Sequence, residues 1–537
     1  MFHSKNRLHR SLMGVLWLFV LLVAAIVPAQ AQTVTVTDEN DIVYDIVDKA
    51  KMTVKVSATN ATQLASAANP KDVVIPATVT DHSTSATTTE PWTVIGMADR
   101  AFQKAAGLRS ITIEAPLTEI TQFSFNDCAN LESVTLPETV KSLGQHSFSQ
   151  CPKLKSITGI DNVITIASYA FYRCSSLTDI TLPSTLTLLQ GYAFQECTSL
   201  ERITIPGSVK ELQASTFQDC TSLAEVILEE GVQIIGQKAF QGCTSLVHPA
   251  FPASLQRLDP YAFSKCDNLG TVTIQHVYYS HLVYSEATIQ EIVFPESDGN
   301  STPYIGNNLF EKVKGLTEIN VTGFNTLPDG TFLECPDLTT VTLAEGFKSV
   351  GNYAFQKCPK LTSVSIPSTL EYIGHYAFSE CPELEGITFP ATMRTIGNYA
   401  FNKCPKLDNI VLPAGVQFGT CVFSQCNLSS ITFPEEPMVS MADDPFGQQP
   451  DIKSMTIPGW LETVPNKMFF GWDALTSITF EEGVKVLGYN LASFCDNLTT
   501  ITLPSTLTTI NGATVYGSKG AFQGCPKLTL SLIHISE

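Results

Sequence analysis

Apolar residues recur along most of this chain at an interval of 23 residues. The clearest marker is a cysteine that closes the motif Ala-Phe-x-x-Cys. Cysteines in this position form two evenly spaced runs, Cys128, Cys151, Cys174, Cys197, Cys220, Cys243 and Cys266, then Cys335, Cys358, Cys381 and Cys404. A following apolar residue marks nineteen units, at Leu108, Leu131, Leu154, Leu177, Leu200, Leu223, Leu246, Leu269, Ile289, Leu316, Leu338, Leu361, Leu384, Leu407, Leu428, Ile452, Leu475, Leu498 and Leu528. The chain is therefore built mainly from one repeated unit, here called a rung.

Each rung contains one short segment with the alternation of a β-strand. After Leu177, the inward residues are Ile180 and Leu182, and the residues between them face outward. Pro183 then ends the strand because it has no backbone N–H to donate. A period in the twenties with this apolar spacing is typical of leucine-rich repeats. We therefore predict a leucine-rich-repeat solenoid, with stacked short parallel strands on one face and turns and short helical arcs on the other.

The return arc of each rung carries the far wall of the core. Ala170, Phe171 and Cys174 illustrate a small residue beside a large ring, which lets successive layers interdigitate. A glycine recurs just before this arc, and we expect it to adopt positive φ in a turn. The glycines in this position include Gly191, Gly236, Gly351, Gly374 and Gly397. One rung cannot bury its own apolar edge, so stacking must complete the core.

The stretch from Ile396 to Pro413, IGNYAFNKCPKLDNIVLP, resembles the consensus of the BspA-like leucine-rich repeat family. The chain matches this consensus in its period, its Ala-Phe pair, its cysteine and its proline. The resemblance covers about residues 92 to 529. It implies a curved solenoid on the surface of, or released from, host-associated bacteria. It also implies adhesion to extracellular-matrix proteins, mucosal ligands or other bacteria.

Segments that depart from the repeat suggest the remaining organisation. Residues 1–31 combine basic residues, an apolar run and a small-residue cleavage site, which predicts a signal peptide; an uncleaved anchor is the alternative. Residues 32–91 read as a β-rich N-terminal cap, or else a small binding domain. Rungs fill 92–274 and 305–529, around an irregular insertion with one degenerate repeat at 275–304. Residues 530–537 resemble a sequencing-adapter translation, so we expect a truncated gene and a native chain that continues.

In a secreted chain, this many cysteines could form disulfide bonds. Their number is odd, at 15, and most occupy the same position in successive rungs, where side chains run parallel. We predict buried free thiols instead, since cysteine packs as a small hydrophobe. Cys421, five residues before Cys426, is the one candidate for a local bridge.

Charge and motif content narrow the function. The net charge of −19 argues against nucleic-acid binding and against anionic membranes. The nine histidines are scattered, and no nucleotide-binding, metalloprotease or hydrolase motif occurs, so we predict no catalytic residue, metal or cofactor. We expect a non-catalytic, adhesin-like protein, secreted or on the outer cell surface, that binds extracellular proteins or glycoproteins. The alternatives are a glycan-binding surface protein, or the binding region of an enzyme whose C-terminal domain is missing.

Residues in the same outward position of successive strands form columns along the solenoid. A candidate ligand patch lies where the residue types in two such columns change. One column is mostly threonine: Thr112, Thr135, Thr158, Thr181, Thr204, Thr273, Thr342, Thr388, Thr432, Thr456, Thr479 and Thr502. Ile227 interrupts this column. The neighbouring column holds Asp179, Arg202, Glu225 and His248 on successive rungs. Ordinary strand propensity and solvated charge offer a simpler explanation of both columns.

The insertion adds three aromatic residues to this candidate patch. They are Tyr278, Tyr279 and Tyr284, and aromatic side chains are favoured anchors in interfaces. A tolerated surface insertion with no binding role is the alternative.

Overall fold

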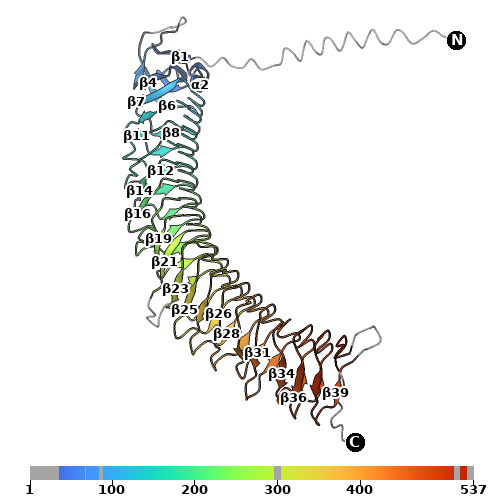
Figure 1. Cartoon of the computed structure of the whole chain (residues 1–537). Helices are drawn as coiled ribbons and strands as arrows, with labels where there is room; N and C mark the ends of the chain where they lie inside the picture. The colour runs from blue at the N-terminus through green and yellow to red at the C-terminus, as the bar shows by residue number, and fades with distance from the viewer. Residues whose placement is uncertain (1–34, 67, 84–88, 296–303, 513–519, 529–537) are drawn as a thin grey trace, which may run out of the picture.

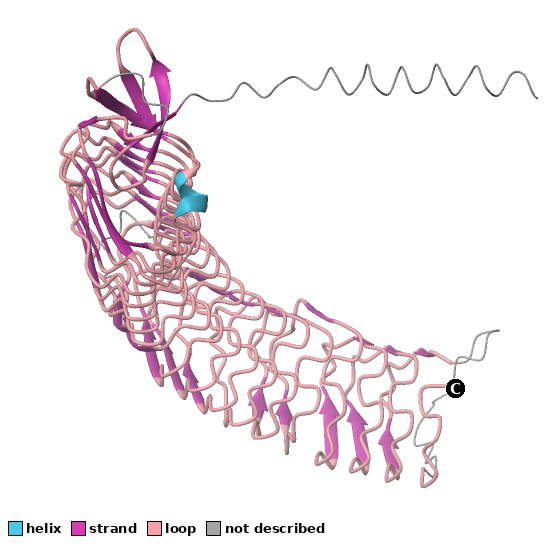
Figure 2. Ribbon diagram, turned by 90° about the horizontal axis from the view of Figure 1, so that it is seen from above, coloured by secondary structure: helices cyan, strands magenta, loops and turns pink. Residues whose placement is uncertain are grey.

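The protein forms an elongated arc in which the rungs follow one another from end to end (Figure 1). This computed structural model describes residues 35–66, 68–83, 89–295, 304–512 and 520–528. The predicted signal peptide, part of the insertion and the 530–537 tail lie outside these residues. Viewed from above, nearly all regular structure consists of short strands joined by turns (Figure 2). The predicted solenoid of stacked parallel strands is confirmed.

A five-stranded cap sheet covers the N-terminal end, with strand order β1-β2-β3-β6-β5. Its elements are β1 (Thr35–Thr37), β2 (Val43–Asp48), β3 (Thr53–Val56), β5 (Thr78–Val79), β6 (Trp92–Met97) and the single-turn helix α2 (Asn60–Gln63). β4 (Lys71–Ile75) instead pairs in parallel with β7 (Leu108–Ile113). The first rung therefore stacks on β4, which the cap segment supplies. This pairing covers the edge of the first ladder that would otherwise be open at its N-terminal end.

The predicted strands stack in parallel on their neighbours and form the first ladder, although the rungs at Leu177, Leu246 and Leu384 contain no strand at this position. Ile203 pairs with Val226 and Thr204 with Ile227, so equivalent residues of adjacent rungs lie side by side. After β4 and β7, the ladder contains β9 (Ser133–Thr135), β11 (Ser156–Thr158), β14 (Arg202–Ile205), β16 (Glu225–Leu228), β19 (Gly270–Thr273), β21 (Ile289–Val293), β23 (Glu318–Val321), β25 (Thr340–Leu343), β27 (Ser363–Ser365), β30 (Ile410–Val411), β32 (Ile431–Thr432), β34 (Ser454–Ile457), β36 (Ser477–Phe480) and β38 (Thr500–Thr502).

A second ladder of two-residue strands runs beside the first, and the sequence analysis missed it. Only one residue of each strand is apolar and inward, too few to reveal an alternation. The strands are β8 (Glu119–Ile120), β10 (Ser142–Leu143), β12 (Thr165–Ile166), β13 (Leu188–Leu189), β15 (Glu211–Leu212), β17 (Ile234–Ile235), β18 (Arg257–Leu258), β20 (Tyr278–Tyr279), β22 (Tyr304–Ile305), β24 (Thr326–Leu327), β26 (Ser349–Val350), β28 (Tyr372–Ile373), β29 (Thr395–Ile396), β31 (Gln417–Phe418), β33 (Ser440–Met441), β35 (Thr463–Val464), β37 (Val486–Leu487) and β39 (Thr509–Ile510).

The return arcs are turns, and no described rung contains the short helical arc that we expected. Two residues per arc, four positions apart, adopt positive φ, as Tyr169 and Arg173 do at 60° each. A right-handed helix cannot pass through such residues. Their backbone N–H groups instead bond to the next rung, for example Arg173 N–H to the Gln195 carbonyl at 2.9 Å.

The glycines before the arcs have a different role from the one predicted. Gly374 and Gly397 do not adopt positive φ. A Cβ atom at Gly374 would lie 2.5 Å from the Asn352 backbone nitrogen, and one at Gly397 would lie 2.6 Å from the His375 nitrogen. Glycine is therefore needed because adjacent rungs approach each other closely at this position.

The core is a continuous column of buried side chains. Phenylalanines of successive arcs stack almost parallel, as Phe194, Phe217 and Phe240 do with centroid separations of 5.3 and 5.6 Å. All three are fully buried. Each ring fills the space between its two neighbours, so the core of one rung is completed by the next.

The cysteines are free and, with the exception of half-buried Cys525, buried, which confirms the predicted thiols. Each thiol in the repeated position donates to a backbone carbonyl in the preceding rung, as Cys174 does to Phe148 at 3.1 Å. Two rungs without this cysteine use Gln449 and Trp472, whose side-chain nitrogens donate to Phe423 and Gly447 at 2.7 Å. The position therefore favours a donor within an apolar wall, although Ala287 and Val313 occupy it in two other rungs.

The candidate bridge between Cys421 and Cys426 is not formed. Cys421 donates to a carboxylate oxygen of Asp444 at 3.3 Å, and Cys426 to the Phe401 carbonyl at 3.1 Å. Each thiol thus has its own partner, in agreement with the two free cysteines.

Charged side chains pair from rung to rung on the surface. Glu371 contacts Lys348 and Arg394 at 2.8 and 2.9 Å. Solvent reaches these side chains, so each pair adds little to the stability of the fold. They show how opposite charges in register on adjacent rungs can pair.

Candidate binding surface

The outward face of the first ladder is a long polar surface. Arg202 and Thr204 on β14 are exposed while Ile203 and Ile205 between and beside them are buried. The same alternation recurs on β16, β23 and β34. The inward residues hold the strand on the core, so the outward residues are free to vary without loss of the fold.

The first ladder is interrupted between β16 and β19. Pro249 occupies the position that holds an inward isoleucine or valine in most other rungs. Proline has no N–H to donate to a ladder, so the segment around it is not a strand. Val247 still bonds to the Ala224 carbonyl at 3.2 Å, which keeps this rung beside β16.

His248 does not face outward as predicted. Its ring packs 4.8 Å from Phe251 and 5.7 Å from Phe263, and its Nε2 lies 3.0 Å from the Tyr284 hydroxyl. Because the strand is broken at Pro249, the chain turns the histidine toward the core and leaves Val247 exposed. Burial lowers the pKa of His248 to about 4.

We expect the stability of the protein to fall between pH 6.5 and 4 because of His248. Its folded pKa of about 4 lies below that of an unfolded histidine, so only the unfolded chain gains a proton in this range. The contribution is complete above about pH 6.5 and lost as the pH falls toward 4, by about 2–3 kcal/mol. Urea unfolding of wild type and His248→Gln across this range measures it. Parallel profiles for the two proteins would contradict the assignment.

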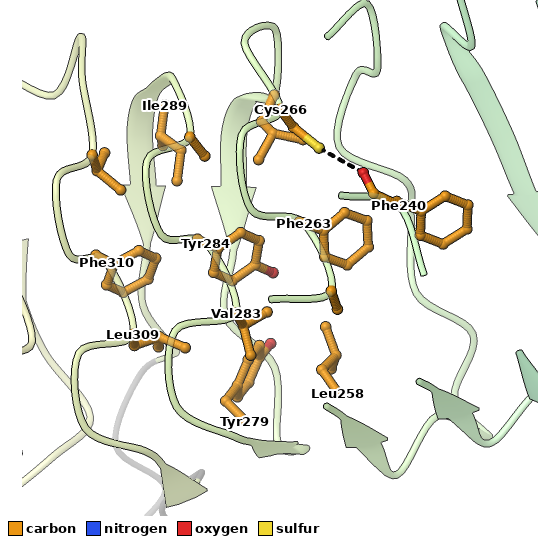
Figure 3. Packing of buried hydrophobic residues seen from close by; sticks show 14 of the residues in the cluster. Phe240, Leu258, Phe263, Cys266, Tyr279, Val283, Tyr284, Ile289, Leu309 and Phe310 are labelled. Carbon is orange, nitrogen blue, oxygen red and sulfur yellow. Dashed lines mark hydrogen bonds between the residues drawn. The ribbon is translucent and has the colours of Figure 1, made fainter. Parts of the chain in front are cut away.

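The tyrosines of the insertion are mostly core residues, which corrects their prediction as surface anchors. Tyr284 stands in the phenylalanine column, between Phe263 at 5.7 Å and Phe310 at 5.5 Å (Figure 3). Tyr279 is also fully buried, and its hydroxyl accepts the Gln275 backbone N–H at 3.0 Å. This part of the insertion is thus a regular rung with tyrosine in place of phenylalanine.

Tyr278 is exposed, but it lies on a different surface from the charged column. It belongs to β20 in the second ladder and stacks on Tyr304 with a centroid separation of 4.5 Å. Arg202 and Glu225 lie in the first ladder. The predicted site residues therefore do not form one patch.

Four predicted residues do share one surface. Asp179, Arg202, Glu225 and Ile227 are exposed on three successive rungs, with Glu225 and Ile227 on the same strand. Among the described residues, none of the three charged side chains forms an ion pair or hydrogen bond, although Arg202 and Glu225 lie side by side in the ladder. Val247, which the sequence analysis did not select, joins them with 54% of its surface exposed, beside Ile227 with 49%. We call these five residues the first-ladder patch.

The described residues show no sign of metal or bilayer-spanning elements. Within these ranges, no three histidine, cysteine, aspartate or glutamate side chains form a group that could hold a metal ion. No helix in the same part of the chain has the length and apolarity needed to cross a membrane.

The two stacked ladders, the phenylalanine column and the 23-residue period define a leucine-rich-repeat solenoid. The chain belongs to the family described as BspA type leucine rich repeat region, whose model matches residues 95–224, 189–317, 279–408, 325–437 and 394–529. No curated protein sequence matches the chain.

Solved structures of bacterial leucine-rich repeat proteins are similar to this chain. A leucine-rich repeat protein from Bacteroides ovatus is 26% identical, with a TM-score of 0.56, over 78% of this chain and 94% of that one. A leucine rich cell surface protein from Faecalibacterium prausnitzii is 25% identical, with a TM-score of 0.40, over 74% and 94%. The family and the Bacteroides ovatus structure are leucine-rich repeat proteins, which is consistent with a binding role.

Proposed function

We propose that this protein is a non-catalytic, adhesin-like binding protein, secreted or displayed on the outer cell surface. Its partners are extracellular proteins or glycoproteins of a host matrix or mucosal layer. The observation that carries the proposal is the first-ladder patch, where exposed apolar side chains adjoin charges that have no partner within the described residues.

The chemistry of the patch supports a protein partner. Arginine and exposed apolar residues are favoured in interface centres, while unpaired charges on the rim select the partner. Ile227 stands where most rungs have an outward threonine. An isoleucine there exposes apolar surface to water and adds nothing to the core, so the exposed side chain suits a contact with a partner. A long, stiff sheet also presents these residues in fixed register.

Binding of the full secreted chain to immobilised fibronectin, collagen and mucin tests the proposal. We expect at least one to bind, and the double variant Arg202→Ser, Ile227→Thr to weaken that binding about tenfold or more. Val411→Thr is the matched control, because Val411 is exposed in the same column on β30. Absence of binding to all three, or equal losses in both variants, would reject the proposal.

A further inference from the structure

An open hollow of about 610 Å³ lies at the turn edge of four rungs in the C-terminal part of the arc. It is distant in sequence from the first-ladder patch. Its walls consist of Gln425, Cys426, Asn427, Gln448, Pro450, Phe470, Gly471, Asp473, Phe494 and Asp496. Its volume lies within the range of small-ligand sites.

The hollow exists because these rungs depart from the repeat. Asn427 is the only residue between Cys426 and Leu428, where most other rungs have two. Gly471, with φ of 69°, occupies a position where Arg173 and Glu196 carry long side chains in other rungs. The missing residue and the missing side chain leave open space at the edge of the stack.

The polar groups around the hollow are of two complementary kinds. The amides of Gln425, Asn427 and Gln448 supply donors and acceptors, and the carboxylates of Asp473 and Asp496 supply acceptors. None of the five forms a side-chain hydrogen bond or ion pair with another described residue. Their hydrogen-bonding capacity is thus available to a ligand.

An aromatic wall completes the hollow. Phe470 and Phe494 meet in a T-shaped arrangement, with centroids 5.5 Å apart and an angle of 77° between the rings. Phe494 occupies the arc position that holds glutamine in other rungs, such as Gln150, and 42% of its surface is exposed. Its ring also lies against the next rung, where a Cβ atom at Gly524 would come within 2.8 Å of the Phe494 Cδ1 atom.

We infer that this hollow is a binding site for a neutral saccharide of one or two rings. Sugar hydroxyls both donate and accept, so they can use the amides and the carboxylates together, and the apolar C–H face of the ring can lie on phenylalanine. A lysine or arginine side chain would leave the amide donors without acceptors. The two carboxylates and the net charge of −19 repel acidic sugars.

The test uses the full chain and two groups of probes, followed by saturation-transfer NMR and calorimetry. The neutral probes are lactose, cellobiose, maltose and diacetylchitobiose; the charged probes are a hyaluronan disaccharide and a trilysine peptide. We expect a neutral disaccharide to bind, and Phe494→Gln and Asp473→Asn each to weaken it about five- to tenfold. Gln150→Ala, in the arc position equivalent to Phe494, should leave affinity unchanged.

Each other result overturns the inference. Binding of none of the neutral sugars, preference for trilysine or for the acidic disaccharide, or equal affinity in wild type and both site variants would do so. Because other rungs carry glutamine at the position of Phe494, we expect Phe494→Gln to fold. A thermal melt of each variant verifies this. The first-ladder patch plays no part in these measurements. Their failure would therefore reject the saccharide site and leave the proposed function untouched.

Discussion

Replacing Phe217 with alanine is expected to lower the free energy of unfolding by about 3–5 kcal/mol. Phe217 is fully buried and stacks on both Phe194 and Phe240, so its removal opens a cavity between two rungs. In a solenoid, stability depends on contacts between nearest neighbours. The loss should therefore also uncouple the rungs on either side, and the chemical-denaturation transition should broaden as well as shift.

Tyr353→Ala is the matched control for this variant. Tyr353 also stacks on the equivalent ring of the next rung, Tyr376, at 5.4 Å, but 42% of its surface is exposed. We expect a loss below about 1 kcal/mol and an unchanged transition width. Similar losses in the two variants would mean that the buried column is not what joins the rungs.

Replacing Gly374 with alanine is expected to cost about 1–3 kcal/mol, although it adds only one methyl group. The added Cβ would lie 2.5 Å from the Asn352 nitrogen and 2.6 Å from the Gly351 carbonyl carbon. Both atoms belong to the backbone of the preceding rung, which cannot move aside without breaking its own ladder contacts. Thermal unfolding monitored by circular dichroism measures the loss.

Gly386→Ala provides the comparison, since a Cβ at Gly386 meets nothing within 4 Å. Its unfolding temperature should stay unchanged or rise slightly, because alanine restricts the unfolded chain. A Gly374→Ala protein as stable as the Gly386→Ala protein would show that the rungs are spaced more widely than the structure has them.

The repeat itself could be predicted from the sequence because each slot has one dominant physical requirement. An inward isoleucine such as Ile203 and a buried cysteine such as Cys174 recur at a fixed interval, and both lie in the core. The second ladder, in contrast, depends on hydrogen bonds between backbones of successive rungs. Any residue can make those bonds, and the one inward residue per rung, such as Ile166, is too short a pattern to identify a strand.

The candidate site was predicted only in part, and the errors share a cause. His248 was placed outward by extending the strand alternation through Pro249, although proline breaks the ladder there. Tyr284 was taken as a surface residue because the intervals of 20 and 27 residues around Ile289 hid its place in the phenylalanine column. Positive φ was expected at glycines such as Gly397, whereas Tyr399 adopts it at 57°. These features follow from contacts between rungs.

Small-angle X-ray scattering from the full chain tests most directly whether neighbouring rungs complete one another's core. With nineteen rungs about 4.8 Å apart, the account predicts an asymmetric distance distribution whose maximum exceeds about 90 Å. A symmetric distribution with a radius of gyration of about 24 Å, the value for a compact domain of this length, would contradict the stacked-rung structure.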